Sequence, residues 1–311
     1  MRIVAALGGN ALLRRGEIAD ADAQRRNVER AVSALAEVAA DHELIVTHGN
    51  GPQVGLLALQ SEAYRAVRPY PLDVLGAESE GMIGYMLDQE LVNALPGRQV
   101  ATLLTQVVVD PFDPAFEHPT KPVGPVYEKD EAQRLAAERG WSVAPDGDRW
   151  RRVVPSPEPR RIVEIETIRL LVDAGVLVVC AGGGGVPVAP GITGGLHGLE
   201  AVIDKDLAAA LLARQLDADA LLLLTDVPAI EAGWGTPDAY PISYATPAEL
   251  RSLDLAEGSM GPKAEAACRF ADGGGLAVIA ALDDALEALA GNAGTTIGNS
   301  LAREAQVACW P

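Results

Sequence analysis

Short apolar runs alternate with segments of helical periodicity along almost the whole 311-residue chain. Apolar residues between 22 and 40 recur at the spacing of one helix face, and further helices are expected after residue 52 and over 200–216 and 262–270. Strands alternating with helices indicate a parallel sheet covered on both faces. We therefore predict an α/β fold, a three-layer α/β/α sandwich around a mainly parallel sheet. The expected strands are residues 3–7, 43–47, 101–109, the end of 170–181, 218–224 and 276–280.

Residues 119–161 break this rhythm. The segment is rich in proline and contains one short helical pattern near residues 130–139. We expect it to form an inserted subdomain that protrudes from the sheet edge, with Lys121 at its start. The chain is expected to form two lobes, residues 1–215, which include this subdomain, and residues 216–311.

The formal net charge of −18 disfavours binding to nucleic acids or to anionic membranes. Three cysteines and four histidines show no disulfide framework and no metal-ligand spacing, so no metal-binding residues are predicted. The first apolar run is broken at Gly8, unlike a signal peptide, and the longest uncharged stretch is too rich in glycine for a membrane helix. We expect a cytoplasmic protein.

Three glycine-rich turns follow expected strands: Gly8-Gly9-Asn10, Gly49-Asn50-Gly51 and Gly182 to Gly185. Glycine lets main-chain N–H groups approach an anion closely, and a following helix adds a positive dipole. Each turn alone is equally well explained as a tight connection, but three together favour one shared anion site. No P-loop sequence occurs, and the spacing of Gly49, Gly51 and Gly55 misses a dinucleotide fingerprint by one residue, so a dehydrogenase is the weaker alternative.

Lysine is rare: only four of the 25 basic residues are lysines. A chain that otherwise uses arginine suggests that a retained lysine is needed for its compact ammonium group. Lys129 lies in a polar run and is interpreted as a solvated surface residue. Lys121, Lys205 and Lys263 lie in unusual contexts and are candidate functional residues. Lys205 is flanked by Asp204 and Asp206, an arrangement that could position its ammonium group for a phosphate.

Eight strings resemble the carbamate kinases, which belong to the amino acid kinase fold family. Nearly the whole chain is covered, and the motifs occur in the family's order. The inserted segment resembles the protruding subdomain of carbamate kinases. The strings are ALGGNAL (6–12), THGNGPQVG (47–55), TKPVGPVY (120–127), VVPSPEP (153–159), AGGGGVPV (181–188), AVIDKDLAAA (201–210), LTDV (224–227) and GSMGPKAEAA (258–267).

The resemblance implies reversible phosphoryl transfer between ATP and carbamate, giving ADP and carbamoyl phosphate. Lys205 and Lys263 would neutralise the moving charge, Asp206 would orient them, and Lys121 would reach the carbamate or the phosphoryl group. Mg²⁺ is expected, held mainly by phosphates and water. The implied carbamate and phosphate residues are Gly9, Asn10, Gly49, Asn50, Gly51, Gly182, Gly183 and Gly184. The candidate nucleotide residues are Gly8, Thr225, Asp226, Val227, Tyr244, Met260 and Gly261.

The resemblance also implies a homodimer with a role in arginine metabolism. It places carbamate in the first lobe and the nucleotide in the second. Residues 228–234 depart from the family pattern, so the adenine and ribose contacts are not predicted. Two alternatives stay open: a kinase of the same fold that acts on another small acid, and a non-catalytic protein that binds a nucleotide or another anion.

Overall fold

The computed structural model describes residues 1–14, 17, 20–191, 194–255 and 260–299. Its centre is an eight-stranded sheet in which every neighbouring pair is parallel except β16 and β17. In spatial order the strands are β15 (Tyr244–Ala245), β17 (Thr295–Ile297), β16 (Leu276–Ala281), β12 (Ala220–Thr225), β1 (Arg2–Leu7), β2 (Glu43–His48), β9 (Leu177–Val179) and β3 (Val100–Thr102). The predicted mainly parallel sheet is therefore confirmed.

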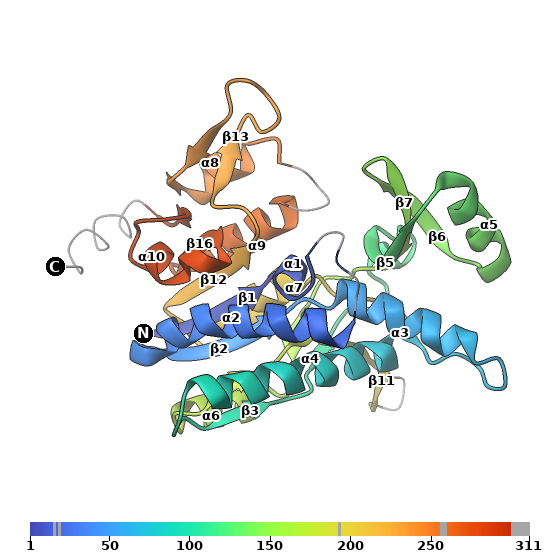
Figure 1. The fold of residues 1–311 in the computed structure, drawn as a ribbon, viewed down its shortest axis with the longest axis horizontal. Coiled ribbons are helices and arrows are strands. Elements are labelled where there is room, and N and C mark those ends of the chain that lie inside the picture. The colour runs from blue at the N-terminus through green and yellow to red at the C-terminus, as the bar shows by residue number, and fades with distance from the viewer. Residues whose placement is uncertain (15–16, 18–19, 192–193, 256–259, 300–311) are drawn as a thin grey trace.

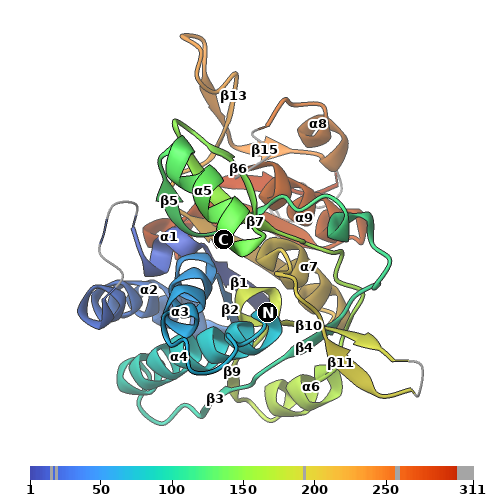
Figure 2. The ribbon, with the colours of Figure 1, turned by 90° about the vertical axis from the view of Figure 1, so that its right-hand side faces the viewer.

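Helices cover both faces of this sheet. Side chains of a strand point alternately to its two faces, so Ile3, Ala5 and Leu7 of β1 enter one core and Val4 and Ala6 enter the other. Figure 2 shows these layers on either side of β1 and β2. The first core packs against α2 (Ala21–Asp41), α4 (Leu72–Ala94) and α10 (Ala285–Leu289), and the second against α6 (Ile165–Asp173), α7 (Lys205–Gln215) and α9 (Met260–Asp272).

The inserted subdomain is a three-stranded antiparallel sheet with one helix, and it projects from the main body (Figure 1). Its first strand begins at Lys121, opposite Val154. Where it meets α3, a Cβ added to Gly55 would lie 2.0 Å from the Cα of Gly124, so two backbones are in direct contact. The elements are β5 (Lys121–Tyr127), α5 (Lys129–Arg139), β6 (Ser142–Asp146), β7 (Arg149–Val154) and, in the main body, α3 (Gly51–Ala63).

Smaller elements complete the described part of the chain. A four-stranded sheet combines β11 (Leu196–Gly198), β10 (Val186–Pro190), β4 (Gln106–Val108) and β8 (Arg161–Ile162). A hairpin of β13 (Ile230–Ala232) and β14 (Tyr240–Ile242) precedes α8 (Pro247–Arg251). The short helices are α1 (Gly9–Leu12), η1 (Pro114–Phe116), η2 (Gly182–Gly184) and η3 (Leu282–Asp284). No helix among the described residues has the length and apolar character needed to cross a membrane.

Several local expectations were wrong in detail. The strand expected over 101–109 is two strands, β3 and β4, which belong to different sheets. The helix expected over 200–216 begins only at Lys205, because the Asp204 side chain caps it. The helical stretch after residue 52 is divided between α3 and α4 around Pro69 and Pro71, since proline removes a helical hydrogen bond. Gly9 and Asn10, expected in a turn, are the first two residues of the short helix α1, and Gly8 is its N-cap.

Candidate active site

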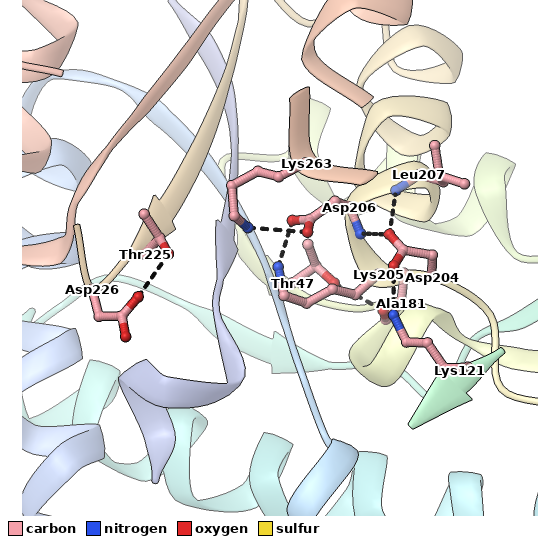
Figure 3. A network of polar contacts seen from close by, with 10 residues as sticks. All are labelled: Thr47, Lys121, Ala181, Asp204, Lys205, Asp206, Leu207, Thr225, Asp226 and Lys263. Carbon is pink, nitrogen blue, oxygen red and sulfur yellow. Dashed lines mark hydrogen bonds and ion pairs between the residues drawn. The ribbon is translucent and has the colours of Figure 1, made fainter. Parts of the chain in front are cut away.

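Two lysines share one buried carboxylate at the carboxyl end of the main sheet. Lys205 Nζ lies 2.5 Å from Asp206 Oδ1, and Lys263 Nζ lies 3.0 Å from Asp206 Oδ2 (Figure 3). Lys205 and Asp206 open α7, whereas Lys263 lies in the first turn of α9. The facing surfaces of these helices are rich in buried alanine, and small side chains allow helices to pack closely. The alanines thus bring together lysines that are distant in the sequence.

The two ammonium groups and the Asp206 carboxylate together carry one net positive charge, and all three side chains are largely buried. Burial alone would raise the pKa of Asp206, but the two ammonium groups outweigh it and hold that pKa well below its usual value. Burial lowers the pKa of Lys205 to about 8, although Asp206 opposes this shift, and Lys263 adds to it. The cluster is therefore an uncompensated buried cation, and an anion bound there would stabilise it.

Asp204 connects this cluster to the inserted subdomain. Its Oδ1 accepts hydrogen bonds from the N–H groups of Asp206 (2.9 Å) and Leu207 (3.2 Å), which caps α7. Its Oδ2 accepts one from Lys121 Nζ at 2.5 Å, from the first residue of β5. Lys121 is therefore bound to the residue that directly precedes Lys205 in the sequence, as Figure 3 shows. One carboxylate fixes both the helix start and the subdomain's lysine.

The three glycine turns meet beside Lys205. A Cβ on Gly49 would lie 3.1 Å from the N atom of Gly9 and 3.3 Å from Cδ of Lys205. Gly183, at φ +66°, lies against the Asn50 side chain, where an added Cβ would be 2.1 Å from the amide nitrogen. Larger residues would close the space between the turns. Gly51 begins α3 and Gly184 packs against the Ile203 carbonyl group, whereas only the backbone of Asn10, within α1, is described.

Buried polar side chains that the sequence analysis missed hold the third turn in shape. Ala181 has φ +51°, an uncommon conformation for a residue with a Cβ. Thr47 Oγ1 donates to the Ala181 carbonyl group at 2.8 Å, and the Ala181 N–H donates to Thr105 Oγ1 at 2.9 Å. The next N–H, that of Gly182, donates to Glu80 Oε1 at 2.9 Å. In the sequence, each of these residues is visible only as a polar residue among apolar ones. That pattern indicates a buried hydrogen bond but does not reveal its partner.

His48 also packs against this turn. A Cβ on Gly182 would lie 2.3 Å from His48 Nε2. Burial lowers the pKa of His48 to about 4, with a backbone hydrogen bond to Gly49 opposing the shift and Lys205 adding to it. The imidazole is therefore neutral near pH 7, and we assign the Nδ1 hydrogen to the 3.1 Å contact with the Gly49 carbonyl oxygen. The ring fills the space behind the glycine turn without adding charge.

The residues predicted for the nucleotide lie around the end of β12. Thr225 ends that strand next to Gly8, and its Oγ1 donates to Asp226 Oδ1 at 3.2 Å. In Figure 3 both lie across from Lys263. The Tyr244 hydroxyl group bonds to the carbonyl oxygens of Gly298 (2.8 Å) and Asn299 (2.9 Å), so it fixes the chain after β17. The remaining residues of this set, Val227, Met260 and Gly261, are partly exposed.

The described residues contain no cluster of three or more histidine, cysteine or acidic side chains able to hold a metal ion. Asp206, the carboxylate nearest the lysines, already has both oxygens in ion pairs. The donor set therefore suits an anion. A magnesium ion would have to be held mainly by phosphate oxygens and water, as this ion commonly is.

A model of the amino acid kinase family matches residues 1–280. A carbamate kinase from Haemophilus influenzae is 56% identical over 299 residues, which cover 96% of each chain. Two structures of the carbamate kinase from Giardia lamblia are each 42% identical over 95% of this chain. The one bound to citric acid has a TM-score of 0.90 and is covered over 97% of its length, and the one bound to AMP-PNP has a TM-score of 0.86 and is covered over 98%.

Proposed function

The chain belongs to the amino acid kinase family and, within it, to the carbamate kinases, and from this premise we propose how it transfers a phosphoryl group between ATP and carbamate. The observation that carries the mechanism is the buried Lys205–Asp206–Lys263 cluster, whose single positive charge faces the glycine turns. Carbamate is already an anion, so its oxygen needs no general base. The reaction needs alignment of two anions and neutralisation of charge on the moving group.

We propose that Lys205 and Lys263 contact the transferring phosphoryl group, one from each helix, while Asp206 keeps both ammonium groups directed at it. Lys121 would contact carbamate or the same phosphoryl group from the subdomain. Its ion pair with Asp204 supports this role, because it brings the Lys121 ammonium group beside α7. The backbone N–H groups of the three glycine turns would bind the carbamate and phosphate oxygens.

The nucleotide is assigned to residues 216–311 and carbamate to residues 1–215. Thr225, Asp226, Val227, Tyr244, Met260 and Gly261, together with Gly8, are the proposed nucleotide contacts. Magnesium is proposed to arrive with the nucleotide phosphates, where it would lower their negative charge before transfer. Lys205 and Lys263 supply the remaining positive charge from the protein.

The deciding experiment incubates the purified protein with ADP, carbamoyl phosphate and magnesium and measures ATP formation. We expect ATP to form at a rate proportional to enzyme concentration and to be absent without carbamoyl phosphate. Parallel reactions with acetyl phosphate and with acetylglutamyl phosphate test the alternative of another small-acid kinase. Binding of ADP without any turnover would instead support a non-catalytic nucleotide-binding protein.

We further propose that the protein acts as a cytoplasmic homodimer in arginine metabolism, as the resemblance implies. The two cysteines in the described residues, Cys180 and Cys268, are buried and free, which agrees with a reducing compartment. Sedimentation of the purified chain tests the dimer directly.

A further inference from the structure

Glu80 is a buried carboxyl group that the proposed chemistry does not use. It lies on α4 and is only 1% exposed. Its Oε1 accepts a hydrogen bond from the Gly182 N–H at 2.9 Å, and its Oε2 accepts one from the Thr105 N–H at 3.3 Å. These donors follow the neighbouring strands β9 and β3. Glu80 on α4 therefore links the segments that follow β9 and β3 at the Gly182–Gly184 turn.

The two backbone N–H donors are the contacts that would stabilise a negative charge on Glu80, and no cationic side chain among the described residues adds to them. In the described part of the chain, Glu80 forms no ion pair with any basic residue. The neighbouring titratable groups are His48 on β2 and the Cys180 thiol just after β9, both neutral near pH 7, and Glu164 before α6, which is negative. The nearby Lys205 acts on His48, whose pKa it lowers further. A buried carboxylate without a cation is expected to take up a proton.

We propose that Glu80 is a positioning residue that holds the Gly182–Gly184 turn through an uncharged carboxyl group, so that anions can bind beside the turn without repulsion from below. This inference rests on the proposed function, which places carbamate and the moving phosphoryl group at that turn. The protonated group keeps its carbonyl oxygen as an acceptor for the Gly182 N–H. A carboxylate would also accept that hydrogen bond, but it would add a negative charge behind the substrate site.

The direction of the resulting pH dependence follows from the protonation state. Burial raises the pKa of Glu80 to about 8, and the backbone hydrogen bonds from Thr105 and Gly182 only partly oppose this shift. In this proposal, anions bind while Glu80 is neutral. The affinity for the anionic substrate is therefore lost as the pH rises through the pKa of Glu80. For a group with this pKa, the ionised fraction rises from about a tenth at pH 7 to about nine tenths at pH 9, which corresponds to a loss of roughly tenfold in anion affinity.

The test compares Glu80→Gln with the wild type and with Glu78→Gln, an exposed position on the same helix. Glutamine has the size of the neutral group and cannot ionise. The measured quantity is KM for carbamoyl phosphate between pH 7 and 9, with ADP saturating. Lys205, whose pKa is also about 8, titrates in all three proteins, so the ratio of wild-type KM to Glu80→Gln KM isolates residue 80. We expect this ratio to rise about tenfold over the range, and the ratio to Glu78→Gln to stay constant.

Two kinetic outcomes overturn the inference. A constant ratio between wild type and Glu80→Gln would mean that the charge on residue 80 does not affect substrate binding. A folded Glu80→Gln protein without activity at pH 7 would mean that the carboxylate itself is required.

A second measurement does not depend on turnover. Infrared difference spectra between pH 7 and 9 should show loss of the carbonyl band of a protonated carboxyl group in the wild type and in Glu78→Gln, but not in Glu80→Gln. Absence of that band from the wild type would overturn the inference even if the enzyme were fully active. A titrating band in a protein that makes no ATP would instead refute the proposed function alone.

Discussion

Lys205 and Lys263 occupy a place that arginine could not fill. Both ammonium groups bind the same carboxylate of Asp206, one oxygen each. The stem of Lys205 passes next to Gly49, where even a Cβ would lie 3.3 Å from its Cδ. A planar guanidinium group is broader and directs its hydrogen bonds in a fixed fork. Close packing therefore gives a physical reason for lysine at position 205 in a chain that otherwise prefers arginine. At position 263 the reason is the shared carboxylate, which leaves one oxygen for a compact ammonium group.

Removing either lysine tests this charge cluster. We expect turnover of Lys205→Ala and Lys263→Ala to fall by about 10²–10³, the usual cost of losing one preorganised charge donor. The matched control is Lys129→Ala, because Lys129 is exposed at the start of α5 and lies over the Trp150 ring. Its turnover should stay at the wild-type rate. Near-normal kcat in either cluster variant would contradict its proposed role.

The structure brings Lys205, Lys263 and the glycine turns together, and the sequence pointed to these residues because rare residues and strand-end glycines are visible in it. Their catalytic roles stay predictions. Glu80 and Thr105 escaped notice for a physical reason. Each makes its key hydrogen bond to the backbone of the turn that begins at Ala181, and such a partner depends on the tertiary fold rather than on local spacing.

At the scale of elements, Asp204 joins the start of α7 to the start of β5. Its two oxygens have separate tasks, since one caps the helix and the other binds Lys121. Both side chains of this ion pair are largely buried, with 12% of Asp204 and 29% of Lys121 exposed. The cap and the ion pair can therefore be separated by substitution, because asparagine also caps helices but carries no charge.

We expect Asp204→Asn to keep the helix cap and to raise KM for carbamoyl phosphate, because Lys121 loses its anchor, and its loss of unfolding free energy reflects the broken ion pair alone. Asp204→Ala should show the same kinetic change and lose about 1 kcal/mol of stability in addition, since the cap is removed. Lys121→Ala should likewise affect KM more than kcat. Denaturant unfolding and steady-state kinetics separate the two effects. Equal stability of the Asn and Ala variants would contradict the capping role.

The strand expected over 101–109 shows why an apolar run does not fix the boundaries of elements. The run continues through residues 103–105, but the backbone leaves the main sheet after Leu103, whose N–H is the last to donate to β9. The Thr105 N–H donates to Glu80 on α4, and the Thr105 hydroxyl group donates to the Leu103 carbonyl group at 2.9 Å. The chain then pairs with β10 in the second sheet. Buried polar contacts thus end a strand that hydrophobicity alone would extend.

At the scale of the whole molecule, the proline-rich composition of residues 119–161 predicted a segment outside the main sheet, and the structure contains a separate three-stranded sheet there. The composition could not predict where this subdomain contacts the main body. That contact brings Gly55 against Gly124, two glycines far apart in the sequence, and their match is defined only once both elements are folded. The position of Lys121 depends on this contact, because it lies on the same strand as Gly124.

Gly55→Ala tests whether the position of the subdomain controls the site. The new Cβ would meet the Gly124 backbone at 2.0 Å, where no flexible side chain can move aside, so β5 must shift away from α3. We expect a loss of stability of about 1–3 kcal/mol from overpacking. Displacement of β5 should also separate Lys121 from Asp204. KM for carbamoyl phosphate should therefore rise as in Lys121→Ala, while ADP affinity, measured by calorimetry, stays unchanged.

The matched control is Gly76→Ala on α4, because a Cβ at that position meets no atom within 4 Å and alanine favours a helix by about 0.5–1 kcal/mol over glycine. It should unfold at or slightly above the wild-type temperature with unchanged kinetics. Combining Gly55→Ala with Lys121→Ala decides between a shifted lysine and a general disturbance. If the subdomain acts through Lys121, the double variant should have nearly the KM of either single variant. Fully additive effects would show that the contact between Gly55 and Gly124 affects the site by another route.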